Sequence, residues 1–213
     1  MRAPTGLALS LSASLLLTAC GGGGGGGSPT PLGPTVTMTL PATLTFGGGC
    51  AEIRESGDVV LPPLSLFVAD YGVNASRSIF TFFVGAGEDR EVVSATLRLV
   101  PAVTHGDPLQ GFTNGLRAER VNISGAFDAF DYDVTPAVGA PSPMSPVPGD
   151  APGVIELDVT DQLRGWIGSG SNFFYLRVRL DRLLNNMSID GYEFDLDGGG
   201  NPALIPTLIA EMR

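Results

Sequence analysis

Residues 153–180 read GVIELDVTDQLRGWIGSGSNFFYLRVRL and predict two β-strands on either side of a short helix. In residues 155–159, apolar side chains stand at every second position, and they do so again in residues 173–180. This is the period of a strand that buries one face. Both segments are therefore predicted to be strands with one face in a core.

The helix is predicted over about 160–168, because Leu163, Trp166 and Ile167 follow the spacing of one helix face. Thr160 stands where a side chain can cap the first turn, and the glycines at 168 and 170 end the helix. We expect Trp166 to lie in the core, where a large apolar side chain seals the helix against the edge of the sheets.

The same alternation recurs on both sides of this stretch, in residues 35–40, 94–99 and 192–197. Residues 79–84 are apolar on both sides, which indicates an inner strand covered on each face. A Pro-rich run over 136–152 predicts a surface loop. Short strands separated by Gly, Pro and Asn clusters predict a single all-β domain over 35–213, built as a sandwich or barrel.

Four segments carry a resemblance to a known family: SRSIFTFFVG (76–85), EVVSATLRLV (91–100), the stretch 153–180, and NPALIPTLIAEM (201–212). Their order resembles the bacterial DNRLRE-type domain, although the motif that names the family is absent. The resemblance covers roughly residues 66–213. It implies a jelly-roll-like antiparallel β-sandwich that occurs as a non-catalytic module on extracellular bacterial proteins, in some cases bound to polysaccharide.

The first twenty residues have the layout of a secretory signal. Arg2 supplies a positive charge, residues 7–17 form an apolar stretch too short to span a membrane, and Leu17-Thr18-Ala19-Cys20 resembles the lipobox of bacterial lipoproteins. We interpret 1–19 as a lipoprotein signal peptide and Cys20 as the acylated first residue of the mature chain. An ordinary signal peptide cut after residue 19 is the alternative.

Residues 21–27 are seven consecutive glycines, so 20–34 is predicted to be a lipidated cysteine followed by a flexible tether. The acyl chains on Cys20 would hold the domain at a lipid bilayer outside the cytoplasm. Gly21 after the cysteine resembles lipoproteins sent to the outer membrane, which applies if the host is diderm.

The composition argues against a nucleic-acid partner and against a zinc site. Twelve basic residues stand against 22 acidic ones, and the net charge of −10 would repel a phosphate backbone, so nucleic acid is not an expected partner. With one His and two Cys, the chain has too few soft ligands for a zinc site.

Glycan binding needs aromatic faces that can stack on sugar rings, beside polar groups that bind hydroxyls. The ligand-binding candidates are Tyr71 and Tyr132, which lie near turns or strand ends, and Tyr175, which alternates with core residues. The alternative for Tyr175 is a structural cross-strand partner on a half-exposed sheet.

Two acidic groups have the oxygen ligands that calcium prefers. Asp195, Asp197 and Asn201 surround three glycines and form the candidate site for a structural calcium ion; residues 128, 131 and 133 are a similar group of aspartates. The alternative is a solvated strand face: if 173–180 pairs with 190–197, Arg177 and Arg179 face these acids across the ladder.

The residues give little support to catalysis. A serine triad needs a histidine base, and His105 is predicted to lie in a turn. Cys50 has no neighbouring basic residue to lower its pKa and is expected to be a structural thiol. A helix-start role explains Asp158 and Asp161. We therefore expect no enzyme but a cell-surface lipoprotein that binds a polysaccharide or other envelope glycan; the alternative is a structural or assembly lipoprotein that docks another envelope protein.

Overall fold

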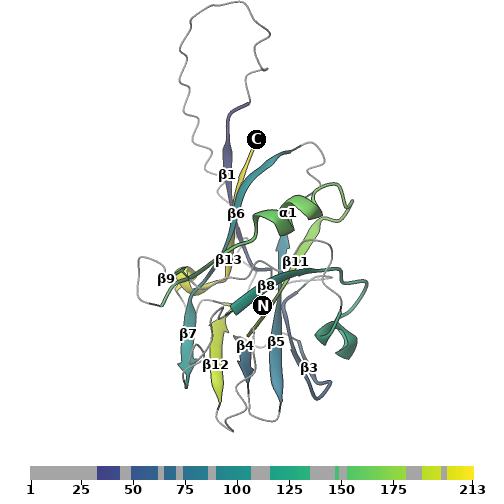
Figure 1. Cartoon of the computed structure of the whole chain (residues 1–213), viewed down its shortest axis with the longest axis vertical. Helices are drawn as coiled ribbons and strands as arrows, with labels where there is room; N and C mark the ends of the chain where they lie inside the picture. The colour runs from purple at the N-terminus through teal and green to yellow at the C-terminus, as the bar shows by residue number, and fades with distance from the viewer. Residues whose placement is uncertain are drawn as a thin grey trace, which may run out of the picture. The chain divides into compact units, whose positions relative to one another are not determined.

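The computed structural model describes residues 33–43, 49–61, 65–70, 74–85, 90–106, 116–134, 147–148, 153–180, 189–197 and 201–213. They form two antiparallel sheets and a short α-helix, so the predicted all-β, jelly-roll-like sandwich is confirmed (Figure 1). The signal peptide predicted for 1–19, and Cys20 with nearly all of the tether, lie outside the described residues. No helix in the described ranges is long and apolar enough to cross a membrane.

The first sheet, sheet A, has five strands within the described residues, and every pair is antiparallel. In spatial order they are β1 (Val36–Pro41), β13 (Thr207–Met212), β6 (Val92–Leu99), β10 (Ile155–Asp158) and β9 (Val147–Pro148). The chain's first described strand therefore pairs with its last, Val36 opposite Met212. β9 falls in the Pro-rich run that was predicted to be loop throughout; most of that run lies outside the described residues.

The second sheet, sheet B, holds eight of the described strands. They are β2 (Ala51–Arg54), β3 (Val59–Val60), β4 (Ser65–Asp70), β5 (Ala75–Phe83), β7 (Pro101–His105), β8 (Leu116–Val121), β11 (Phe173–Leu180) and β12 (Asp190–Asp195). His105, predicted to lie in a turn, is instead the last residue of β7, and the turn begins at Gly106.

Sheet B branches at the long strand β5. One edge of β5 pairs with β2, while the other pairs with β4 at its first residues and with β11 from Ser78 onward. β11 continues to β8, and β4 continues to β12 and β7. The pairing of 173–180 with 190–197 considered from the sequence is therefore wrong, because β11 and β12 lie on different branches.

The main core fills the space between the two sheets. It takes the side chains at alternate positions of each strand, as the sequence pattern predicted. Its largest fully buried members are Phe80, Phe82, Phe174, Phe194, Leu66, Leu97, Leu99, Leu116, Leu157 and Leu163. β5 is buried on both faces from Ile79 to Phe82, which confirms an inner strand there, but Phe83 is 55% exposed.

The predicted helix is confirmed as α1 (Thr160–Trp166), two residues shorter at its end than expected. Trp166 is buried in the core, and its Nε1 donates to the carbonyl of Phe173 at 2.9 Å. Thr160 does not cap the helix: it is the first helical residue, and its Oγ1 accepts a hydrogen bond from the backbone N of Ala95 on β6 at 2.9 Å. The threonine instead joins α1 to sheet A.

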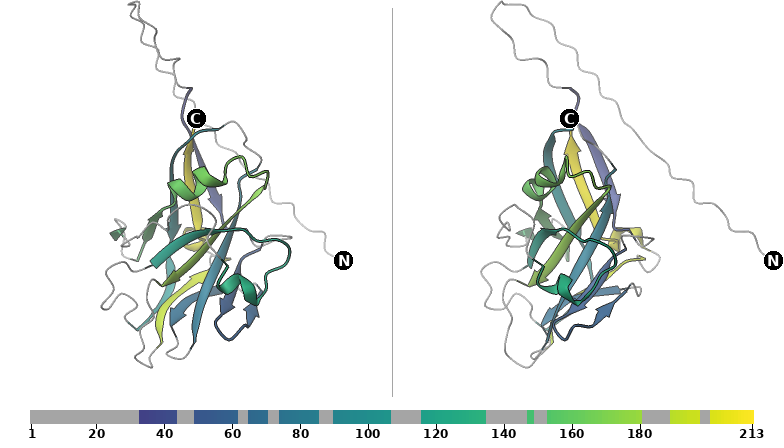
Figure 2. Two further views of the ribbon diagram at one scale, coloured as in Figure 1. Left: turned by 45° about the vertical axis from the view of Figure 1, so that its right-hand side comes forward. Right: turned by 90° about the vertical axis from the view of Figure 1, so that its right-hand side faces the viewer.

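A second, smaller apolar cluster lies on the outer face of sheet B. The buried members are Ala51, Ile53, Ala75, Ile79, Val121 and Tyr132. The segment after β8, with the 3-10 turn η1 (Ala129–Tyr132), packs over this face, and Figure 2 shows η1 on the side of sheet B and α1 at the end near the C-terminus. We call residues 122–134 the covering segment. It decides which outer side chains of β5, β8 and β11 reach solvent.

Candidate ligand-binding face

The structure describes two of the three tyrosines that were predicted to bind a ligand. Tyr71 lies outside the described residues. Tyr132 is buried in the second cluster, and the guanidinium carbon of Arg77 stands 3.8 Å from its ring centroid. Tyr175 is half-buried on the outer face of β11 and packs against the same cluster. Of the two candidate tyrosines that the structure describes, Tyr175 is therefore the one better placed to meet a ligand.

Tyr175 belongs to a continuous line of rings, which we call the aromatic row: Phe83, Phe173, Tyr175 and Phe127. Ring centroids lie 5.6 Å apart for Phe83 and Phe173, 6.4 Å for Phe173 and Tyr175, and 6.3 Å for Tyr175 and Phe127. The interplanar angles along the row are 67°, 39° and 85°. The middle pair is the closest to parallel, and the two end pairs meet edge to face.

The strand pairing builds this row. Phe173 and Tyr175 are two residues apart on β11 and so share a face, and Phe83 on β5 lies directly opposite Phe173. Phe127 reaches Tyr175 from the covering segment. The three phenylalanines are not among the residues that the sequence offered as ligand-binding candidates. Their alternation with core residues could have placed Phe173 and Phe83 on outer faces, but only the pairing of β5 with β11 brings them together.

The tyrosine hydroxyl of the row stays protonated at neutral pH. Desolvation raises the pKa of Tyr175 above its ordinary value of 10.0. The hydroxyl is therefore protonated at neutral pH and can donate a hydrogen bond to a ligand oxygen.

Next to the row, one carboxylate binds two arginines. Glu119 on β8 accepts from Arg177 at Oε2 (3.1 and 2.7 Å) and from Arg179 at Oε1 (2.9 and 2.8 Å). Glu119 and Arg177 are almost fully buried. The sequence suggested that these arginines face the acids of β12; the structure corrects this, because the partner strand of β11 is β8.

The same arginines fix the covering segment. Nη1 of Arg177 donates to the carbonyls of Tyr132 (2.8 Å) and Asp131 (3.3 Å). Arg77 on β5 also donates to the carbonyl of Tyr132 and binds Asp133 Oδ1 at 2.8 Å. Buried charge on the sheet therefore holds η1 through its backbone, and η1 in turn shields that charge from water.

The calcium candidates hold local structure. The backbone N of Asp197 donates to Asp195 Oδ1 at 3.2 Å, and Asn201 Oδ1 caps a 3-10 turn, η3 (Pro202–Leu204), by accepting from Ala203 N at 3.1 Å. In the other group, Asp128 and Asp131 form a capping box at η1. Within the described residues, no three His, Cys, Asp or Glu side chains gather as a metal site would need. Calcium at Asp195, Asp197 and Asn201 stays a prediction.

Cys50 is a free, fully buried thiol, and its Sγ lies 3.5 Å from the carbonyl oxygen of Thr43. Burial raises the pKa of Cys50 to about 12, so the thiol is protonated at neutral pH and is a poor nucleophile there. Asp158 accepts from the backbone N of Thr160 at 2.9 Å, which agrees with the predicted helix-start role.

No family model matches the chain, and no curated protein matches it. The resemblance to the DNRLRE-type domain therefore stays a prediction. The candidate ligand-binding site is therefore the outer face of sheet B, where rings reach solvent beside a hydrogen-bonded arginine network.

Proposed function

We propose that the protein is a membrane-anchored extracytoplasmic lipoprotein whose β-sandwich is a non-catalytic module that binds a polysaccharide or other envelope glycan. The observation that carries the proposal is the aromatic row, with Phe83 55% exposed at its end. An apolar ring at the surface loses no hydrogen bonds when a sugar covers it, and it gains from removing apolar area from water.

In this proposal, Phe173 and Tyr175 form the centre of the binding site. At 39° they are the closest to parallel of the neighbouring pairs in the row, so they need the smallest change of angle to face one sugar ring together. The protonated Tyr175 hydroxyl supplies a polar contact to a sugar hydroxyl. Phe83 extends the site by one ring toward the end of β5.

The anchor is proposed on the sequence alone. The lipobox at 17–20 marks Cys20 for acylation, and the glycine-rich tether leads to β1. In a diderm host the expected destination is the outer membrane. A Cys20→Ala variant is expected to leave the membrane fraction; if it stays there as firmly as the natural chain, the anchor proposal is wrong.

A second candidate is a structural or assembly lipoprotein that docks another envelope protein. The steep angles at the two ends of the row, 67° and 85°, favour it. Rings that meet edge to face form one continuous apolar surface rather than a series of parallel platforms, and such a surface also suits an apolar protein partner.

The deciding experiment screens the whole chain, purified in mild detergent, against a panel of envelope polysaccharides with and without calcium. Phe83→Ala and Phe173→Ala are the test variants. Leu61→Ala is the matched control, because Leu61 is 57% exposed and is not a member of the row. Glycan retention that the two test variants lose and the control keeps supports the proposal.

No retention on any glycan would overturn glycan binding. If an envelope protein were then recovered by the natural chain and by Leu61→Ala, but not by Phe83→Ala, the second candidate would take its place. Calcium-dependent retention that an Asp195→Asn variant removes would support the predicted ion site.

A further inference from the structure

The η1 turn carries an exposed aromatic side chain outside the aromatic row. Phe130 is 86% exposed, and three carboxylates lie beside it in the sequence, at Asp128, Asp131 and Asp133. We call residues 128–133 the acidic turn. Single exposed apolar residues are common on protein surfaces, so exposure alone gives Phe130 no function.

The acidic turn is held rigidly, and this distinguishes Phe130 from a side chain on a loose loop. The backbone N of Phe130 donates to Asp128 Oδ1 at 2.8 Å, and that of Asp128 donates to Asp131 Oδ2 at 2.9 Å. The sheet arginines fix the carbonyl at residue 132. These bonds order the backbone that carries Phe130, so a partner that binds the ring does not have to order the turn as well.

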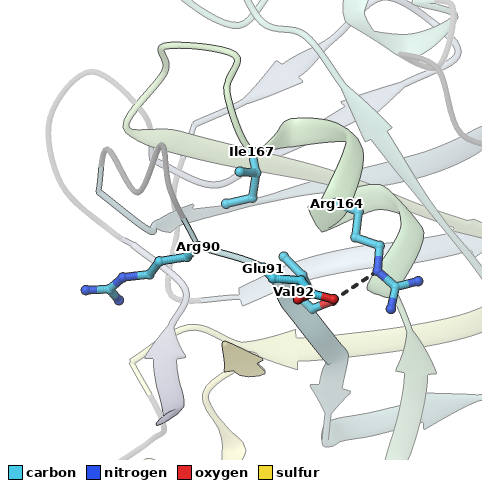
Figure 3. Close-up of a pocket in the computed structure, with 5 residues that line it drawn as sticks. All are labelled: Arg90, Glu91, Val92, Arg164 and Ile167. Atoms are coloured by element: carbon cyan, nitrogen blue, oxygen red, sulfur yellow. Dashed lines mark hydrogen bonds between the residues drawn. The ribbon is translucent and has the colours of Figure 1, made fainter. Parts of the chain in front are cut away.

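A pocket of about 280 Å³ lies where β6 begins beside α1, lined by Arg90, Glu91, Val92, Arg164 and Ile167. We call it the Arg-lined pocket. Figure 3 shows Arg90 and Arg164 on opposite sides of Glu91 and Val92, with Ile167 above them. An apolar cavity of about 150 Å³ can hold a benzene molecule. The Arg-lined pocket is therefore large enough for a phenyl ring.

The charges of the pocket complement those of the acidic turn. Arg164 binds Asp161 at 3.2 Å, and Glu91 is paired with Arg213 at 2.8 Å. Among the described residues, Arg90 contacts the sulfur of Met38 at 3.6 Å rather than a carboxylate. The pocket therefore offers Arg90 to a carboxylate of another molecule, although the chain as a whole carries a net charge of −10.

We propose that Phe130 of one copy of this chain inserts into the Arg-lined pocket of a second copy, with the aspartates of the acidic turn facing Arg90. Figures 1 and 2 show η1 well apart from α1 in all three views, and the pocket is lined by residues of α1 and the start of β6, so one copy cannot fill its own pocket. Two different surfaces meet in such a contact, which therefore links copies head to tail into a ring or an open chain. This proposal does not depend on what the aromatic row binds.

The test is sedimentation velocity of the whole chain in mild detergent at high micromolar concentration. The natural chain is expected to form dimers and larger species. Phe130→Ala and Ile167→Glu are each expected to weaken self-association by at least about tenfold, as is typical when a central aromatic contact is lost. Phe83→Ala, in the aromatic row, is the control and is expected to associate like the natural chain.

Mixing the two variants gives the sharpest outcome. Phe130→Ala keeps its pocket and Ile167→Glu keeps its Phe130, so the mixture is expected to form dimers and nothing larger. Circular dichroism checks that each variant is folded, and Arg90→Glu replaces Ile167→Glu if the latter unfolds, because Arg90 is exposed. A monomeric natural chain, undiminished association of Phe130→Ala, or a mixture that stays monomeric would each overturn the proposal.

Discussion

Arg177 on β11 lies directly opposite Glu119 on β8 and donates two hydrogen bonds to one of its carboxylate oxygens, at 3.1 and 2.7 Å. Arg179 binds the other oxygen. One buried carboxylate therefore binds two guanidinium groups on the outer face of sheet B. The covering segment depends on this arrangement, since Arg177 also holds the carbonyls of η1.

Replacing Glu119 with Gln should destabilise the fold strongly. The substitution keeps the size of the side chain but leaves Arg177 buried without its counter-charge, a loss that typically costs about 3–5 kcal/mol. Urea unfolding measures the change. Asp133→Asn is the control: its carboxylate also binds an arginine, but it is 81% exposed, so we expect a loss below about 1 kcal/mol. Equal effects of the two substitutions would contradict this interpretation of the network.

The contribution of Glu119 should vanish in acid. Burial raises the pKa of Glu119, but the hydrogen bonds from Arg179 and Arg177 outweigh burial and hold the pKa below its ordinary value of 4.5. Because the folded pKa is the lower one, the contribution is fully present above about pH 4.5 and is lost as the pH falls through the folded pKa. The stability difference between the natural chain and Glu119→Gln, measured from pH 7 to pH 3, should shrink below pH 4.5. A difference that grows in acid would show that the carboxylate is not stabilised in the folded state.

The sequence was sufficient for the helix and for the strands with clear alternation because each depends on a local pattern, whereas β7 and β9 fall where a turn and a loop were predicted. The alternation at residues 174, 176, 178 and 180 identifies the core side of β11, and the spacing of Leu163 and Trp166 identifies α1. The pairing of strands is not local. β11 could not be assigned to β5 and β8 rather than β12 from alternation alone, since both arrangements bury the same face.

The candidate site could be predicted only in part, because contacts between distant segments leave no local pattern in the sequence. The alternative of a solvated strand face placed Arg177 opposite acids at the surface, but η1 covers that face and buries Arg177. Tyr132 is a ligand-binding candidate in the sequence because it lies near a turn or strand end, but the structure buries it in the second apolar cluster. A covering segment that follows a strand by several residues leaves no period in the sequence, so the second apolar cluster could not be predicted.

Adjacent phenylalanines on β5 should respond very differently to truncation. Phe82 is fully buried between the sheets, and Phe82→Ala should cost about 3–5 kcal/mol. Phe83 points to the outer face, where its main ring contact is Phe173, so Phe83→Ala should cost about 0.5–1.5 kcal/mol. Chemical denaturation of both variants checks this. A large loss in Phe83→Ala would mean that any effect of this variant on ligand binding reflects unfolding.

A methyl group at Gly191 should be difficult to accommodate. Gly191 lies within β12, between β4 and β7, and a Cβ there would stand 2.4 Å from the Cβ of Ala69 and 2.5 Å from the carbonyl oxygen of Val68. Since the second contact is backbone, the strands must move apart, and overpacking of this kind costs about 1–3 kcal/mol. For a domain of this size each kcal/mol lowers Tm by about 2–4 °C, which thermal unfolding can resolve.

Gly33→Ala is the matched control for this substitution, because no atom lies within 4 Å of the added Cβ, and its Tm should be nearly unchanged. The double variant Gly191→Ala/Ala69→Gly removes the contact between the two methyl groups but keeps the contact with the carbonyl of Val68. We therefore expect it to recover part of the loss, after allowing for the cost of Ala69→Gly alone. Additive effects of the two substitutions would show that Ala69 is not what the added methyl group meets, and that β4 and β12 are farther apart here than the 2.4 Å contact implies.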